Sequence, residues 1–130
     1  MFKYLTFALI LLFAVCGCTA PHNNYLEASD FVTLLKQDGL PVGNTRVIPA
    51  DPFRASSALA VQVGDSEIGV YKYDRTSDFQ KKRLDKIEKT KRIYITGIPY
   101  PVEVYGSFMF FGLEKNKHKR AILKTIKNFK

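Results

Sequence analysis

The sequence predicts an α+β fold, with an antiparallel sheet of about five to six strands and helices packed on one face. Residues 59–63 and 68–73 alternate in polarity around the turn-forming segment 64–67, which is typical of a β-hairpin. Residues 108–111 read Phe-Met-Phe-Phe, and such an unbroken apolar run favours a strand buried on both faces. Three segments with apolar residues at helical spacing precede, separate and follow the predicted strands, as expected for an α+β layer arrangement.

A short amphipathic helix is predicted from Ser29 or Asp30 to Gly39. Its apolar residues recur at spacings of three and four, and glycine commonly forms the left-handed cap that ends a helix. The segment 44–48 is a weak strand candidate, and two prolines favour a loop over 48–57. The apolar positions of the helix are Phe31, Leu34 and Leu35.

The second half of the chain is predicted to alternate helix, strands and helix. Residues 74–77 offer several N-cap side chains for a heavily charged, solvent-facing helix that ends near Thr90. Strands are predicted at 92–96, 102–105 and 108–111. The segment 116–129 is predicted to be a basic amphipathic helix. Its core-facing residues are Ile122, Ile126 and Phe129.

The N-terminal sequence MFKYLTFALILLFAVCGC has the three parts of a secretory signal. Lys3 precedes an apolar run over residues 4–15, and small residues follow. As a helix, that run would extend only about 18 Å, whereas the hydrocarbon core of a bilayer is about 30 Å thick. Cleavage is therefore favoured over a permanent span, and we predict a signal peptide at residues 1–17.

The end of the apolar run resembles the lipobox of bacterial lipoproteins. Cys18 has Gly17 directly before it and an aliphatic residue, Val15, three positions before it. The competing Cys16 would place a β-branched residue where the signal peptidase requires a small one. We therefore predict that Cys18 carries diacylglycerol and palmitate as the first mature residue, with an ordinary signal peptide or an uncleaved anchor as the alternative.

This assignment divides the chain into a signal peptide, a lipidated tether at residues 18–24 and a single envelope domain at residues 25–130. The acyl chains would attach the protein to a membrane. The residue after Cys18 is Thr19 and not an aspartate. By resemblance to the sorting of Gram-negative lipoproteins, the absence of an aspartate at this position favours the outer membrane in such a host. In a Gram-positive host, the anchor would lie at the outer face of the cell membrane.

The chain is basic, with 20 Lys and Arg against 12 Asp and Glu and a net charge of +8. A basic surface attracts anionic lipid, acidic envelope polymers or nucleic acid, and the predicted export disfavours nucleic acid. Two roles are open to the basic C-terminal segment. One is contact with a partner or an anionic surface, and the other is only to keep the outer face of a helix soluble. The second role is favoured, because the apolar residues of the segment are needed for the core. The candidate contact residues are Lys115, Lys117, Lys119, Arg120, Lys124 and Lys127.

No catalytic, metal or cofactor motif is recognisable. His22 and His118 have no nucleophile or carboxylate at a familiar spacing, and acylation would occupy Cys18, the sole cysteine after residue 17. We therefore expect no catalytic residues, no metal site, no cofactor and no enzymatic activity.

Two carboxylate pairs invite an acid and base interpretation, but structural roles explain them more simply. Asp65 and Glu67 belong to the predicted hairpin turn. Asp85 and Glu88 lie among lysines, so charge pairing along a helix is expected for them.

A row of tyrosines is the candidate binding surface. If helices cover only one sheet face, the other face would expose tyrosines beside lysines, and such a patch would mark a partner site. Cross-strand packing is the plainer explanation. The residues are Tyr71, Tyr73, Tyr94, Tyr100 and Tyr105.

Several apolar motifs spread over most of the predicted mature chain. They are Phe31-x-x-Leu34-Leu35 with Gly39, Pro52-Phe53, Leu59-x-Val61-x-Val63-Gly64 leading to Val70-Tyr71-x-Tyr73, Pro101 and Tyr105, and Phe108 to Gly112. Together with the lipobox, they resemble a loose group of small, mostly uncharacterised bacterial lipoproteins with a single domain of about this length. The resemblance implies a fold and a location, but no agreed activity.

The leading hypothesis is a non-enzymatic role in binding or assembling another envelope component, either a protein or an anionic polymer. The alternative is a cell-wall hydrolase or an inhibitor of one. Carboxylates drawn together in a cleft would favour the alternative.

Overall fold

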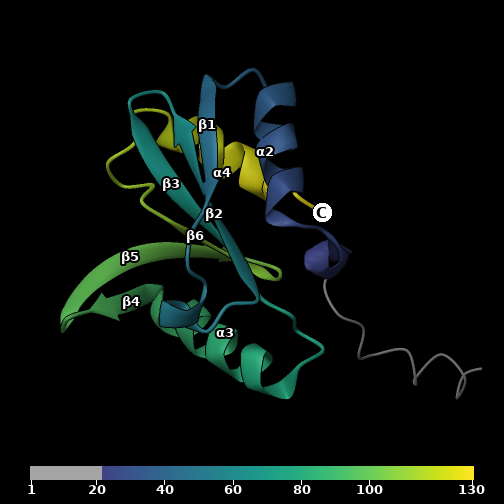
Figure 1. The fold of residues 1–130 in the computed structure, drawn as a ribbon, viewed down its shortest axis with the longest axis vertical. Helices are drawn as coiled ribbons and strands as arrows, with labels where there is room; N and C mark the ends of the chain where they lie inside the picture. Colours follow the sequence, from purple (N-terminus) through teal and green to yellow (C-terminus); the bar gives the residue numbers. More distant parts are fainter. Residues whose placement is uncertain (1–21) are drawn as a thin grey trace, which may run out of the picture.

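The computed structural model describes residues 22–130, which form one six-stranded antiparallel sheet with helices on both sides (Figure 1). The strand order is β1-β2-β3-β6-β5-β4. The strands are β1 (Val42–Val47), β2 (Ser57–Val63), β3 (Ser66–Lys72), β4 (Arg92–Ile95), β5 (Ile98–Tyr105) and β6 (Phe108–Phe111). The helices are α2 (Ala28–Gln37), α3 (Asp78–Thr90) and α4 (Lys119–Lys127), with short 3₁₀ helices η1 (His22–Tyr25) and η2 (Asp51–Phe53).

Strand β6 occupies the interior of the sheet, between β3 and β5. Phe108 and Phe110 belong to the core on one face, Met109 belongs to the core on the other, and all three are fully buried. The prediction that residues 108–111 form the core strand is confirmed, as is the hairpin of β2 and β3.

The helices are divided between the two faces of the sheet. Helices α2 and α4 pack against one face, where Phe31 and Ile122 join Phe110 in a common core. Helix α3 packs against the opposite face, where Leu84 contributes to a second core. The α+β class is confirmed, while the expected placement of helices on one face holds only for α2 and α4. Two buried residues of the charged α3, Leu84 and Ile87, are enough to dock it.

The observed starts of β5 and α4 differ from the predicted boundaries. Strand β5 begins at Ile98 and includes two prolines, which its partly open edge tolerates. Helix α4 begins at Lys119 instead of residue 116, because Asn116 folds back and donates to the Val63 carbonyl at 2.9 Å. The Asn116 side-chain oxygen also accepts from the His118 N–H at 2.8 Å.

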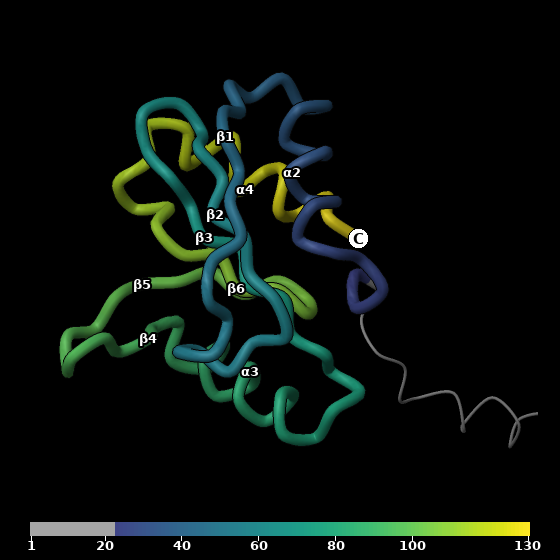
Figure 2. Tube along the Cα trace, viewed as in Figure 1, coloured from purple at the N-terminus to yellow at the C-terminus, as the bar shows by residue number. Residues whose placement is uncertain are grey.

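The predicted tether at residues 18–24 is corrected at its end. Asn23 is only 2% exposed, and its amide donates to the Phe129 carbonyl at 3.2 Å and to the Tyr105 carbonyl at 3.1 Å. Asn24 accepts the Arg75 N–H at 2.9 Å. These bonds make the asparagines part of the folded domain, so the first described residues lie beside the C-terminus (Figure 2). Residues 1–21 lie outside the described part of the chain.

Within residues 22–130, no helix combines the length and apolarity needed to cross a bilayer.

Candidate functional site

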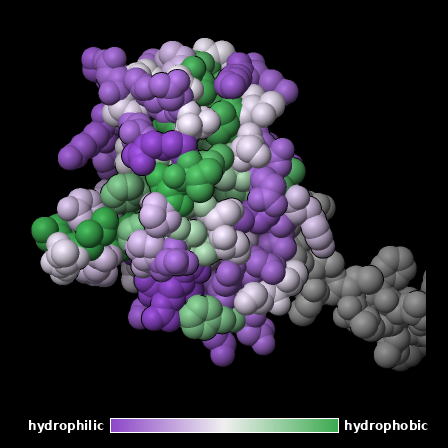
Figure 3. Space-filling view, viewed as in Figure 1, coloured by the Kyte–Doolittle hydropathy of each residue, from purple (hydrophilic) through white to green (hydrophobic). Residues whose placement is uncertain are grey.

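The hairpin formed by β4 and β5 projects from the body of the domain, on the side away from the first described residues (Figures 1 and 2). Its tip carries apolar side chains that other elements leave uncovered: Tyr94 is 63% exposed, Ile98 is 53% exposed and Ile95 is 36% exposed. Figure 3 shows this apolar tip beside more polar neighbours. A group of exposed apolar residues on a polar surface is typical of a partner site.

Strand β5 has an open edge beside this tip because β6 is shorter. Val102 pairs with Phe111, the last residue of β6, whereas residues 98–101 pair only with β4. Pro99 and Pro101 have no N–H, so they cannot form hydrogen-bonded pairs with β4, and their nitrogens face the open edge. Such an edge is a poor template for another strand and is suited to side-chain contacts instead.

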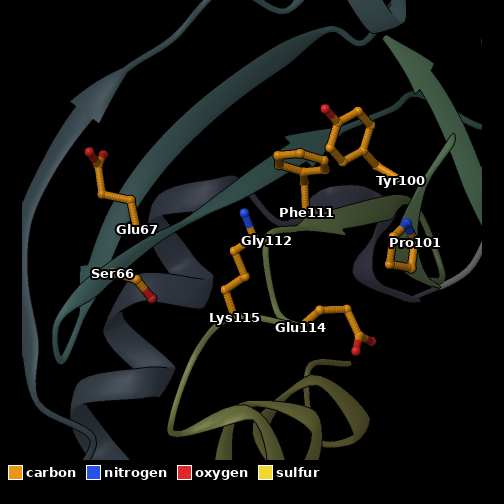
Figure 4. A pocket seen from close by; sticks show the side chains of 8 residues that line it. All are labelled: Ser66, Glu67, Tyr100, Pro101, Phe111, Gly112, Glu114 and Lys115. Carbon is orange, nitrogen blue, oxygen red and sulfur yellow. The ribbon is translucent and has the colours of Figure 1, made fainter. Parts of the chain in front are cut away.

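A pocket of about 260 Å³ lies at this open edge (Figure 4). Its wall is mainly apolar, and the rings of Tyr100 and Phe111 meet there with centroids 5.8 Å apart. Gly112 lets the chain turn below the pocket with a φ of +88°, a conformation that favours glycine. The lining residues are Ser66, Glu67, Tyr100, Pro101, Phe111, Gly112, Glu114 and Lys115.

The charged residues at the rim are largely neutralised by neighbours. Glu67 accepts a hydrogen bond from Arg46 at 3.1 Å, and Glu114 accepts one from Lys119 at 2.6 Å. Lys115 forms no ion pair within residues 22–130, so it supplies a free positive charge at the rim. The pocket therefore combines an apolar wall with one available cation.

The carboxylates at this pocket are not arranged as an acid and base pair. In Figure 4, the carboxylates of Glu67 and Glu114 lie on opposite sides of the pocket and point away from each other. Each is also engaged by its own cation. Among the described residues, no group of three His, Cys, Asp or Glu side chains is placed to hold a metal ion.

The predicted tyrosine row does not form one surface. Tyr71 and Tyr73 are buried below α3, and Tyr105 packs with the opposite core. Only Tyr94 and Tyr100 reach the candidate site. The row fails because α3 covers the face that was expected to be open. Burial also raises the pKa of Tyr73, whose hydroxyl donates to the Phe53 carbonyl at 2.7 Å.

Two of the six basic residues of the C-terminal segment form ion pairs, and the other four form none with residues 22–130. Lys117 pairs with Asp65 at 3.1 Å, and Lys119 pairs with Glu114. Lys115 lines the pocket. The remaining three lie exposed on α4, at positions Arg120, Lys124 and Lys127. The predicted inner face of this helix is confirmed, since Ile122, Ile126 and Phe129 are buried.

The second carboxylate pair has a partner that the sequence did not indicate. Asp85 and Glu88 both bind the guanidinium of Arg75, at 2.6 and 2.9 Å, instead of the lysines of their own helix. Arg75 also donates to the Gly106 carbonyl at 2.7 Å, and its side chain is only 11% exposed. The pairing fixes α3 to the turn between β5 and β6. No local sequence pattern could predict it, because it joins separate elements.

Two further polar residues have local structural roles. His118 precedes α4 and lies against Gly64, where an added Cβ would come within 2.8 Å of the imidazole. Asp74 accepts hydrogen bonds from the hydroxyl and the N–H of Thr76, at 2.6 and 2.9 Å. These bonds lower the pKa of the Asp74 carboxyl. Cys18 and the predicted signal peptide lie outside the described residues.

Curated relatives of the chain are lipoproteins. It is 32% identical over 104 residues to "Uncharacterized lipoprotein YajG" of Escherichia coli strain K12, and it matches the protein of that name from Escherichia coli O6:H1 strain CFT073 equally well. The alignment covers 80% of this chain and 54% of each relative, so the chain spans about half the length of the curated relatives it matches. The match confirms the resemblance to uncharacterised bacterial lipoproteins.

No protein-family model matches the sequence, and no solved structure matches it significantly.

Proposed function

We propose that the chain is a lipid-anchored, non-enzymatic protein of the bacterial envelope that binds or helps assemble another envelope protein through the β4–β5 hairpin. The lipoprotein relatives and the lipobox at Cys18 support the anchor. The membrane would be the outer membrane in a Gram-negative host and the cell membrane in a Gram-positive one.

The observation that carries the binding role is the continuity of the hairpin tip with the pocket. Ile98 and Tyr100 belong to the same strand, and the exposed tip leads directly to the apolar pocket wall. The pocket volume of about 260 Å³ is slightly below the range of about 300–1,000 Å³ that is usual for small-molecule sites. A single apolar side chain of a protein partner is the occupant that fits this size.

A hydrolase has less support from the same site. Inverting and retaining glycosidases place two carboxyl groups across the scissile bond, at separations of roughly 5–10 Å. Here Glu67 and Glu114 point apart, and each has its own cation. Paired carboxylates around a mainly apolar wall support a binding role over hydrolysis.

The anchor is tested by the intact mass of the protein from cells, with wild type beside Cys18→Ser and both fractionated into membrane and soluble pools. We expect a diacyl or triacyl mass on wild type, and release of the variant from the membrane. An unmodified or uncleaved wild-type mass would show that the N-terminus is an ordinary signal or an uncleaved anchor.

The binding surface is tested with a photo-crosslinking amino acid at Tyr94 in the full-length protein. The control carries it at Val47, which is 83% exposed on the edge strand β1 at the other end of the sheet order. We expect a discrete adduct from position 94 and none from position 47. Ile98→Asp should abolish the adduct, because it places a charge in the apolar contact.

The same adduct from both positions, or an adduct at position 94 that survives Ile98→Asp, would contradict the hairpin as the binding surface. Ile98 is 53% exposed, so the substitution should leave the fold intact, and an unchanged melting temperature verifies this.

A further inference from the structure

Helix α4 exposes a stripe of positive charge that no other described element covers. Arg120, Lys124 and Lys127 are spaced by four and three residues, so they follow one another along the same side of the helix. The opposite side, with Ile122 and Ile126, is buried in the core. No acidic residue occurs after Glu114, so the stripe has no negative neighbour on its own segment.

The start of the described chain is bonded to the same helix end. The Asn23 amide donates to the Phe129 carbonyl at 3.2 Å, and the Tyr105 hydroxyl donates to the Lys127 carbonyl at 3.1 Å. If Cys18 carries the lipid, five backbone steps separate it from Asn23, which limits their distance to roughly 17 Å. The stripe itself extends only about 10 Å along the helix from residue 120 to 127. A lipid anchor therefore keeps the stripe close to the headgroups.

We propose that the exposed stripe of α4 docks on the anionic headgroups of the membrane that holds the lipid anchor. This placement rests on the anchor at Cys18 from the proposed function. It turns α4 towards the membrane. The tip of the β4–β5 hairpin, which projects away from the first described residues in Figures 1 and 2, stays available to a partner. The attraction is electrostatic, between the basic side chains and the anionic headgroups. It acts over a Debye length of about 8 Å at physiological salt.

Helix α3 carries the rival stripe. Lys82, Lys86 and Lys89 have the same spacing and are also exposed. Asp85 and Glu88 stand among them, however, and lower the net charge of that surface. The C-terminal end of α3 also leads into β4, away from the first described residues. The α4 stripe is thus the better match to an anionic surface.

The test uses the lipidated protein reconstituted in vesicles with nitroxide-labelled headgroups. A dye on Ala121→Cys reports the approach of α4 to the headgroups, because Ala121 is exposed beside Arg120. We compare vesicles of phosphatidylcholine alone with vesicles that also contain phosphatidylglycerol. We expect strong quenching of the dye only when phosphatidylglycerol is present, and relief of the quenching by added salt.

The charge-neutralised protein carries Arg120→Gln, Lys124→Gln and Lys127→Gln, and the matched control carries Lys82→Gln, Lys86→Gln and Lys89→Gln. At about 5-fold per charge, the three α4 changes should lower the docking equilibrium constant on the order of 100-fold. The α3 control should lower it several-fold at most. Loss of quenching in the control instead of the α4 variant would overturn the proposal in favour of α3.

Equal quenching in neutral and anionic vesicles would also overturn the docking, while an acyl mass on Cys18 would leave the anchor intact. If the intact mass shows no acyl chain, the anchor fails and this placement fails with it. The two failures are therefore distinguished by the mass of the same sample.

Discussion

Asn23 accepts the backbone N–H of Ser107 at 2.8 Å, although the two residues are 84 positions apart in the chain. The Asn23 amide group reaches two further backbone carbonyls, so one buried side chain joins the first described segment, the turn after β5 and the end of α4. This arrangement makes Asn23 the central polar connection between the two ends of the domain.

Replacing Asn23 by alanine should destabilise the domain by about 2–4 kcal/mol, because a buried N–H, a buried carbonyl and a partly buried carbonyl lose their partner. Urea unfolding measures the loss. Asn128→Ala is the matched control, since Asn128 is exposed and its side chain makes no hydrogen bond with residues 22–130. Similar losses in the two variants would show that the Asn23 network contributes little.

Gly106→Ala should destabilise the protein more than Gly97→Ala. Both glycines have positive φ, +59° and +79°, so both variants incur the backbone strain of about 1–2 kcal/mol. An added Cβ at Gly106 would collide with the Asn23 side-chain oxygen, whereas no heavy atom lies within 4 Å of one added at Gly97. The difference between their unfolding free energies isolates the collision. Equal values would mean that Asn23 can move aside freely.

Arg75→Gln should cost about 1–3 kcal/mol, because it leaves the Gly106 carbonyl and two carboxylates without their shared, largely buried donor. Arg46→Gln breaks a pair whose side chains are 65% and 46% exposed, and its expected cost is below about 1 kcal/mol. Chemical denaturation of both variants provides the comparison. A larger loss for Arg46 would contradict the structural role assigned to Arg75.

Tyr73→Phe should alter the response of stability to alkali. Burial raises the pKa of Tyr73 in the folded protein, whereas an unfolded tyrosine ionises near pH 10. Stability from this group is complete below about pH 10 and is lost as the pH rises further, because the unfolded state then releases the proton. The variant lacks this group. The stability difference between wild type and variant should therefore stay constant from about pH 8 to pH 9 and narrow as the pH rises from about 10 to 11.

The measurement is the urea midpoint of both proteins across that range. Tyr71, whose pKa is also raised by burial, is present in both proteins. A stability difference that stays constant with pH would indicate that Tyr73 ionises equally in both states.

The elements with strong local periodicity were predictable from sequence. Apolar patterns predict the β2–β3 hairpin, strand β6 and the buried side of α4. In each of these elements, the pattern indicates which side chains are buried. Helix α3 was predicted as a helix, but its many charged residues favoured a solvent-facing position. The burial of Leu84 and Ile87 against the second face of the sheet was therefore missed. The N-terminal extent of β5 was missed because proline normally argues against a strand, and only the unpaired edge makes it acceptable.

The candidate site was predictable only in part. Tyr94 is exposed and Tyr100 lines a pocket because β6 ends before it can cover the start of β5. The point where β6 ends is set by its pairing with β5, so the sequence of one strand alone does not reveal it. The Asn23 and Arg75 networks join residues from separate elements, so no spacing in the sequence marks them.

The meeting of Asn23 with Phe129 also constrains when the domain can finish folding. A chain that leaves a ribosome or a translocation channel with its N-terminus first presents Asn23 early, but the carbonyl it requires arrives more than a hundred positions later. Strand β3 likewise waits for β6 before its second edge is paired. Such non-local contacts slow folding. The final structure can therefore assemble only after β6 and α4 have emerged, and until then the unpaired edge of β3 makes the chain prone to aggregation.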